Sequence, residues 1–129
     1  MAILIDIPKI SDERGSLCFA EWHDLPFEPR RVFWIYGVGE GKTRGGHAHS
    51  QCQELIFPVS GSFDIFVDDK GKTETIHMDS PQQGILIGKN VWCELKNFSP
   101  DAVVVVLASC AYMRDGYIND YDSFRALYS

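Results

Sequence analysis

"GKTRGGHAHSQCQELIFPVSG", residues 41–61, carries the spacing that most strongly constrains the fold, G-x5-H-x-H-x4-E-x6-G. Its central members are His47, His49 and Glu54. In a strand, side chains two residues apart project from the same face, so the two imidazoles are expected to point together, and in a barrel that face can be the interior. The ordinary alternative is a strand end with solvent-facing histidines, or one histidine held by a buried hydrogen bond.

Short segments rich in β-branched and aromatic residues, separated by glycine-rich turns, fill most of the remaining chain. This pattern predicts an all-β sandwich or barrel. The run at 102–109 shows no alternation, so we expect it to be buried on both faces. A short C-terminal helix is predicted where four aromatic residues stand at helical spacing. These are Tyr117, Tyr121, Phe124 and Tyr128.

Composition limits the class of protein. The 129 residues, 45% of them hydrophobic, predict a single domain over 1–129. A net charge of −6 without a basic run argues against a nucleic-acid partner. The N-terminus lacks a signal-peptide pattern and no apolar stretch reaches membrane-spanning length, so we expect no membrane association and a cytoplasmic location. Four widely separated cysteines predict reduced, mostly buried thiols.

The spacing in 41–61 resembles the first motif of the cupins. That resemblance implies an all-β double-stranded β-helix, the jelly-roll barrel of that superfamily, with a short C-terminal helix added. In many cupins the two histidines and the glutamate bind a divalent metal together with a later histidine. Here Cys93 stands where that later histidine is expected, so we predict no metal and no other cofactor.

A narrower similarity runs through nearly the whole chain, including "RGGHAH" at 44–49 and the ending "YINDYDSF" at 117–124. In these segments the sequence resembles the nucleotide-linked 4-keto-6-deoxyhexose 3,4-ketoisomerases. The resemblance implies an isomerase that acts on a dTDP-linked sugar in the biosynthesis of deoxy and amino sugars. Two positions depart from the pattern: Gly46 stands where a bulky aromatic residue is expected, and Cys93 where a histidine is usual.

Paired histidines suit that reaction. Moving a ketone from C4 to C3 requires removal of the C3 proton, an enediol, and delivery of a proton to C4. Imidazole, with an ordinary pKa of about 6.5, can accept and return a proton near neutral pH. We predict His49 as the principal shuttle and His47 as the residue that orients it or exchanges protons with the sugar oxygens. The reverse assignment is almost equally supported.

Four further residues are candidates for the site. Arg44 can place a forked guanidinium on a diphosphate or an enediolate, and Arg14 is a second phosphate candidate whose alternative role is to stabilise a turn. Tyr36 is predicted to point into the site from the preceding strand, with core packing as its alternative. Glu54 is expected to hydrogen-bond a histidine. His23 and His77, outside both motifs, are predicted on the surface.

The apolar strand at 102–109 and the aromatic C-terminal segment predict a homodimer that covers them. By resemblance, strands are exchanged between the subunits and both chains contribute to each pocket, with Tyr117 and Tyr121 at the interface. Two other functions stay open. One is a metal-binding cupin enzyme that uses His47, His49 and Glu54, and the other is a sugar-nucleotide binding module without catalysis.

Overall fold

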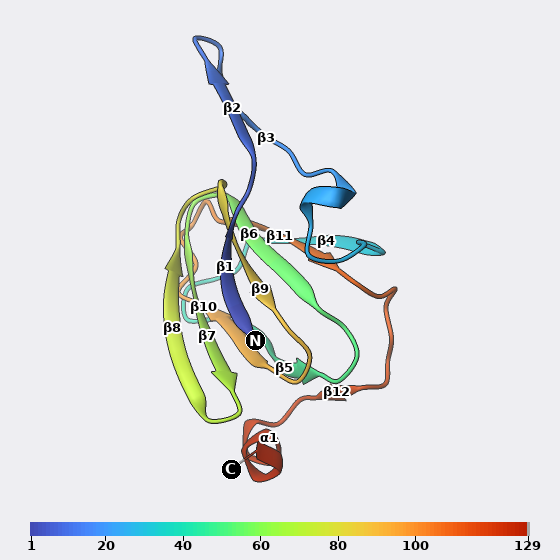
Figure 1. Cartoon of the computed structure of the whole chain (residues 1–129). Coiled ribbons are helices and arrows are strands. Elements are labelled where there is room, and N and C mark those ends of the chain that lie inside the picture. The colour runs from blue at the N-terminus through green and yellow to red at the C-terminus, as the bar shows by residue number, and fades with distance from the viewer. Residues whose placement is uncertain (129) are drawn as a thin grey trace.

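The computed structural model describes residues 1–128 and places two five-stranded antiparallel sheets face to face (Figure 1). The first sheet runs, in order, through β1 (Ala2–Asp6), β9 (Gln83–Ile87), β6 (Glu54–Ser60), β11 (Val103–Ala108) and β4 (Arg31–Tyr36). The second runs through β12 (Tyr117–Ile118), β5 (Arg44–His49), β10 (Trp92–Lys96), β7 (Phe63–Asp69) and β8 (Lys72–Met78). The predicted all-β barrel with one short C-terminal helix is confirmed.

The core lies between the inner faces of the two sheets. Strand β7 shows the expected period of two, because Phe63, Ile65 and Val67 are buried while the residues between them are more exposed up to Phe66. These side chains meet Ile85 from β9 and Val104 from β11 in one cluster. Three members of this cluster, Ile56, Leu95 and Val106, also line a cavity between the sheets.

Strand β11 differs from its prediction. It is an internal strand, paired with both β6 and β4, yet only Val104, Val106 and Ala108 are fully buried. Val103, Val105 and Leu107 face outward and are half-buried. The unbroken apolar run therefore hides a strand with one core face, and its apolar outer face remains partly accessible to solvent or to another chain.

The C-terminal helix α1 spans Tyr121–Tyr128, so the predicted helix is confirmed but Tyr117 does not belong to it. Phe124 is fully buried against Trp92, and the hydroxyl of Tyr121 donates to buried Asp68 at 2.7 Å. These contacts fix α1 against the second sheet. Among residues 1–128, no helix has the length and apolar character needed to cross a membrane.

A hairpin of β2 (Lys9–Asp12) and β3 (Gly15–Cys18) projects from the barrel and is exposed along its whole length (Figure 1). A short 3-10 helix, η1 (Trp22–Asp24), leads from it toward β4. Both predicted surface histidines are confirmed as exposed: His23 lies in η1 and His77 in β8.

The cysteines do not follow the sequence prediction. Cys52 and Cys110 form a disulfide, and Cys18 is an exposed thiol, whereas Cys93 is a buried thiol as expected. The prediction of four reduced thiols was wrong because its premise was separation along the chain. The antiparallel pairing of β6 with β11 sets Glu54, at the start of β6, opposite Ala108, at the end of β11. Cys52 and Cys110 lie just beyond these two residues and are therefore close in space.

Candidate active site

A cavity of about 520 Å³ opens between the two sheets. Its polar wall includes Arg31, Arg44, His47, Glu54, Tyr112, Arg114, Tyr117 and Asn119. The apolar wall includes Phe33 and Ile35 from β4, whose alternating pattern turns these two side chains inward. A polar mouth above an apolar floor is the usual form of a small-molecule site.

His47 and Glu54 face each other across the cavity from different sheets. His47 stands on β5 and Glu54 at the start of β6, and 3.9 Å separates the Nε2 of His47 from the Oε1 of Glu54. Both side chains are largely buried but reach the cavity. The carboxylate faces the imidazole, but 3.9 Å is longer than a hydrogen bond, so the hydrogen bond expected between Glu54 and a histidine is not formed in this structure.

Cys93 forms the cavity wall directly behind this pair. It is the β10 partner of His47, and its side chain is buried. Burial, together with the nearby charge of Glu54, raises the pKa of the Cys93 thiol well above its ordinary value. The group therefore stays a neutral thiol near neutral pH and adds no charge beside His47.

His49 is held differently from His47. Its Nδ1 accepts hydrogen bonds from the backbone N–H groups of Gln51 at 2.9 Å and Cys52 at 3.0 Å, while its Nε2 is buried without a hydrogen-bond partner. Because Nδ1 serves as an acceptor, the neutral ring carries its proton on Nε2. Burial lowers the pKa of His49, an effect that the backbone of Asp115 partly opposes.

Tyr117 separates His49 from the cavity, and the sequence did not identify this role. Its ring packs edge-on against both imidazoles, with centroids 5.0 Å from His47 and 4.4 Å from His49. Strand β12 pairs with β5, which sets Tyr117 opposite His49. From the sequence, Tyr117 was assigned to a helix and to a subunit interface. Nothing in the local sequence indicates that β12 pairs with the strand that carries His47 and His49.

Arg44 lies at the mouth of the cavity, where the sequence placed it. It precedes Gly45 and Gly46, which both have positive φ and accompany a bulge in the pairing of β5 with β10. A bulge re-aims the strand and its side chains. Gly46 suits this backbone, with φ at +74°, and a Cβ there would contact nothing within 4 Å. Arg31 and Arg114, which are not among the site residues predicted from the sequence, add two further cations to the lining.

Two predicted site residues lie away from the cavity. Tyr36 is on the outer face of β4 and is 70% exposed, because Phe33 and Ile35 occupy the inner face. The prediction that Tyr36 points inward was wrong, because side chains alternate between the two faces of a strand and Tyr36 falls on the outer one. Arg14 lies in the turn of the β2–β3 hairpin and pairs with Asp12 at 2.7 Å, which is the turn-stabilising alternative. Within one chain, Arg14 does not reach the cavity.

The residues do not fit the facial metal set considered from the sequence. Within residues 1–128, the donor atoms of His47, Glu54 and Cys93 lie within 4.8 Å of one another, but His49 is not part of this cluster. The Nδ1 of His49 is occupied by backbone donors and its Nε2 is buried. His47, His49 and Glu54 therefore do not form a facial ligand set in this structure.

The buried His49 predicts a pH-dependent stability. Its pKa is lowered in the folded state, so between that pKa and the unfolded value of about 6.5 the unfolded chain binds more protons, and stability is lost as the pH falls through this range. His77 acts in the opposite sense, because Asp64 raises its pKa. In a His77→Ala background, urea midpoints measured from pH 8 to 5 are expected to fall below about pH 6.5. Adding His49→Gln should flatten this fall, and an unchanged fall would contradict the assignment.

Comparison with known proteins places this geometry in a family. The family described as "FdtA: WxcM-like, C-terminal" matches residues 2–129. A TDP-4-oxo-6-deoxy-alpha-D-glucose-3,4-oxoisomerase from Aneurinibacillus thermoaerophilus is 37% identical over 123 residues, which are 95% of this chain and 88% of the relative.

Two solved structures share the fold at comparable identity. The WlaRB TDP-quinovose 3,4-ketoisomerase from Campylobacter jejuni is 39% identical, with a TM-score of 0.90 over 97% of each chain. The 3,4-ketoisomerase QdtA from Thermoanaerobacterium thermosaccharolyticum, as a histidine-to-asparagine mutant in complex with TDP-4-keto-6-deoxyglucose, is 31% identical, with a TM-score of 0.93 over 98% of this chain and 93% of that one. The cupin-type barrel predicted from the sequence is thus confirmed, and this chain belongs to the FdtA, WxcM-like family.

Proposed function

We propose that the chain is a TDP-sugar 3,4-ketoisomerase, an isomerase that converts a TDP-4-keto-6-deoxyhexose into its 3-keto isomer as one domain over residues 1–129. The observation that carries this proposal is His47 facing Glu54 in a cavity of about 520 Å³, in a chain that shares nearly its whole length with named ketoisomerases. Such a volume suits the sugar with part of its nucleotide.

The reaction moves one proton between carbons and one between oxygens. His47 takes the C3 proton, which leaves an enediol across C3 and C4, and returns a proton to C4. The hydroxyl at C3 loses its proton as the carbonyl oxygen at C4 gains one, so no external oxidant is consumed. His47 is suited to this exchange because it lines the cavity and has Glu54 beside its Nε2.

His49 takes a different part in this proposal. Its Nε2 is buried beside the backbone of Asp115 and Gly116, and it forms no hydrogen bond within the usual distance limits. In this proposal the backbone at 115–116 moves away when the sugar binds, and Nε2–H then donates to the developing enediolate oxygen, as a neutral imidazole can. The sequence favoured His49 as the principal shuttle; the hydrogen bonds at its Nδ1 favour the reverse assignment.

The nucleotide diphosphate lies at the mouth, where Arg44 and Arg114 supply positive charge in an otherwise acidic protein. Guanidinium groups match phosphate oxygens with paired hydrogen bonds. The complexes of QdtA with TDP and with a TDP-sugar support this ligand class. We place the enzyme in the cytoplasm, where nucleoside-diphosphate sugars are made.

A homodimer is part of the proposal. Strand β4 is an edge strand whose outer face exposes Val32, Trp34 and Tyr36, and the projecting hairpin exposes Ile10 and Leu17. Exposed apolar edges invite pairing with another chain, and an isolated two-stranded hairpin is only marginally stable in water. A second copy that receives the hairpin covers both surfaces and brings Arg14 to the partner's cavity.

The dimer is tested by light scattering after gel filtration. The wild-type protein is expected at twice the monomer mass of 14.6 kDa, and Trp34→Glu at the monomer mass. Leu127→Glu is the matched control, because Leu127 is similarly exposed but lies on α1. A fully active wild-type monomer would contradict this part of the proposal.

The function is tested by proton NMR of the chelator-treated protein with TDP-4-keto-6-deoxyglucose in deuterium oxide. Deuterium in the sugar together with a 3-keto product supports the proposal, and the coupling of the new C4 proton gives its stereochemistry. Turnover that requires added divalent metal would instead support a metal-dependent cupin that uses His47, Glu54 and Cys93. TDP binding without turnover under either condition would support a binding module.

A further inference from the structure

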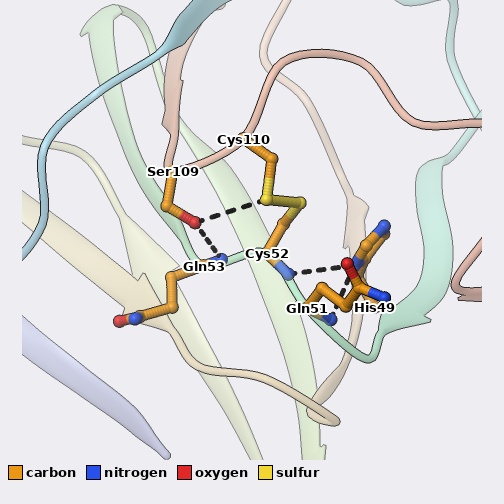
Figure 2. Close-up of a disulfide and its surroundings, with 6 residues drawn as sticks. All are labelled: His49, Gln51, Cys52, Gln53, Ser109 and Cys110. Carbon is orange, nitrogen blue, oxygen red and sulfur yellow. Dashed lines mark hydrogen bonds between the residues drawn. A yellow bond between two sulfur atoms is a disulfide. The ribbon is translucent and has the colours of Figure 1, made fainter.

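The disulfide between Cys52 and Cys110 joins two segments that both reach the active-site cavity. The two cysteines are 58 residues apart in sequence and 5.6 Å apart between their Cα atoms. Cys52 lies in the turn between β5 and β6, and Cys110 directly follows β11 (Figure 2). Both cysteines are partly exposed.

The Cys52 side of the bond holds His49. The backbone N–H of Cys52 and that of Gln51 both donate to the His49 Nδ1, and Figure 2 shows these two bonds joining the imidazole to the turn that carries Cys52. The turn therefore fixes both the position of the ring and the nitrogen that carries its proton. A shift of this turn would therefore change the position of the His49 ring and the hydrogen bonds at its Nδ1.

The Cys110 side of the bond begins the segment at 110–119, which forms one wall of the cavity. This segment contributes Tyr112, Arg114, Tyr117 and Asn119 to the lining. The same segment returns to His49, since Gly116 accepts a hydrogen bond from the Ser50 N–H at 3.0 Å. Gly116 has a φ of +93°, and a Cβ on it would lie 2.9 Å from His49 Cε1. The bridge thus closes a ring of contacts around His49.

Near the disulfide, hydrogen bonds between Gln53 and Ser109 also join the start of β6 to the end of β11, but they are weaker than the covalent bond. Besides the disulfide, the Gln53 N–H donates to the Ser109 hydroxyl at 2.8 Å, and the Ser109 N–H donates to the Gln53 carbonyl at 2.9 Å (Figure 2). Beyond Ser109, residues 111–116 contain no helix or strand. Without the covalent link, this mostly exposed stretch keeps only a few contacts, such as that of the Tyr112 ring with Arg31, and it can open locally.

We propose that Cys52–Cys110 is a redox switch on the active site, which rests on the ketoisomerase function proposed above. In the oxidised enzyme the bond holds His49 and the segment at 110–119 in working positions. A cellular dithiol of the thioredoxin class reduces it: the S–S bond breaks, two thiols form, and the reductant becomes a disulfide. Disulfides of cytoplasmic proteins are usually transient and redox-sensing, which suits this role.

The test compares oxidised and dithiothreitol-reduced enzyme under anaerobic conditions. Thiol titration after unfolding should give two free thiols in the first and four in the second. Reduction is expected to lower kcat about tenfold, because a small displacement of a catalytic group costs this much or more. The double variant Cys52→Ser with Cys110→Ser should match the reduced enzyme and ignore dithiothreitol. The variant Cys18→Ser, at an exposed free thiol, should respond as the wild type does.

Hydrogen exchange separates this proposal from the function on which it rests. In the segment at 50–52 the backbone amides donate to Gly116 and His49, and they are expected to exchange at least tenfold faster after reduction, whether or not the enzyme turns over the chosen sugar. Equal kcat and equal exchange in the two redox states would overturn the switch. No turnover in either state, with faster exchange after reduction, would overturn the proposed reaction and leave the redox response of this segment standing.

Discussion

Replacement of His47 by asparagine is expected to lower kcat by about three orders of magnitude, within the range that general acid–base groups contribute. The amide keeps much of the size of the ring and can hydrogen-bond to Glu54, but it cannot accept the C3 proton. His47 is one of many residues that line the cavity, so most contacts with the TDP-sugar remain in the variant. The KM for the TDP-sugar should therefore change by less than a few fold. The loss is therefore expected in the chemical step.

Deuterium exchange measures that step directly. In deuterium oxide the His47→Asn variant should leave the C3 proton in place during a time in which the wild-type enzyme replaces it completely. His77→Asn is the matched control, because His77 is an exposed histidine on β8 that pairs with Asp64 outside the cavity. Exchange at the wild-type rate in His47→Asn would remove His47 from the role of base.

The sequence predicted the fold well because the signal is repeated many times along the chain. Each strand carries its own alternation and each turn its own glycine, so an error in one segment does not change the class. The motif at 41–61 also singled out His47 and Glu54, which lie 3.9 Å apart in the lining of one cavity. Arg44 followed from its position three residues before His47.

The residues that the sequence misplaced depend on parity or on distant contacts. In "VFWIY" both faces of β4 carry large side chains, so the pattern does not say whether Tyr36 or Ile35 points inward. Tyr117 stands four residues before Tyr121, a spacing that also fits a helix. The pairing of β12 with β5 instead decides its position, and this contact spans almost seventy residues. No local signal encodes such a contact.

The two histidines show the same limit at one site. The spacing H-x-H correctly predicted that the rings would lie near each other, and both contact Tyr117. It could not predict the turn after His49, in which two backbone N–H groups occupy Nδ1. Since that turn decides which nitrogen carries the proton, the difference in role between His47 and His49 comes from backbone geometry and not from residue type.

A pair of substitutions at His49 tests this difference. Glutamine can accept from the backbone N–H groups through its carbonyl and donate through its amide, as the neutral ring does, but it cannot carry a proton between carbons. Leucine keeps the volume and loses both functions. We expect His49→Gln to keep deuterium exchange at C3 within about tenfold of the wild type, and His49→Leu to lose about 10²–10³ in kcat, the usual cost of removing a donor to a developing oxyanion.

Both variants must be folded for this comparison. His49→Leu leaves two backbone N–H groups without their acceptor, which is expected to lower the free energy of unfolding by about 1–3 kcal/mol. TDP affinity and a cooperative urea transition provide that control. If His49→Gln instead abolishes C3 exchange as completely as His47→Asn, then His49 is itself the proton shuttle. In that case the His49 ring must break its hydrogen bonds with the Gln51 and Cys52 N–H groups during turnover. While Nδ1 accepts these two bonds, the proton of the neutral ring stays on Nε2, which then cannot act as the base.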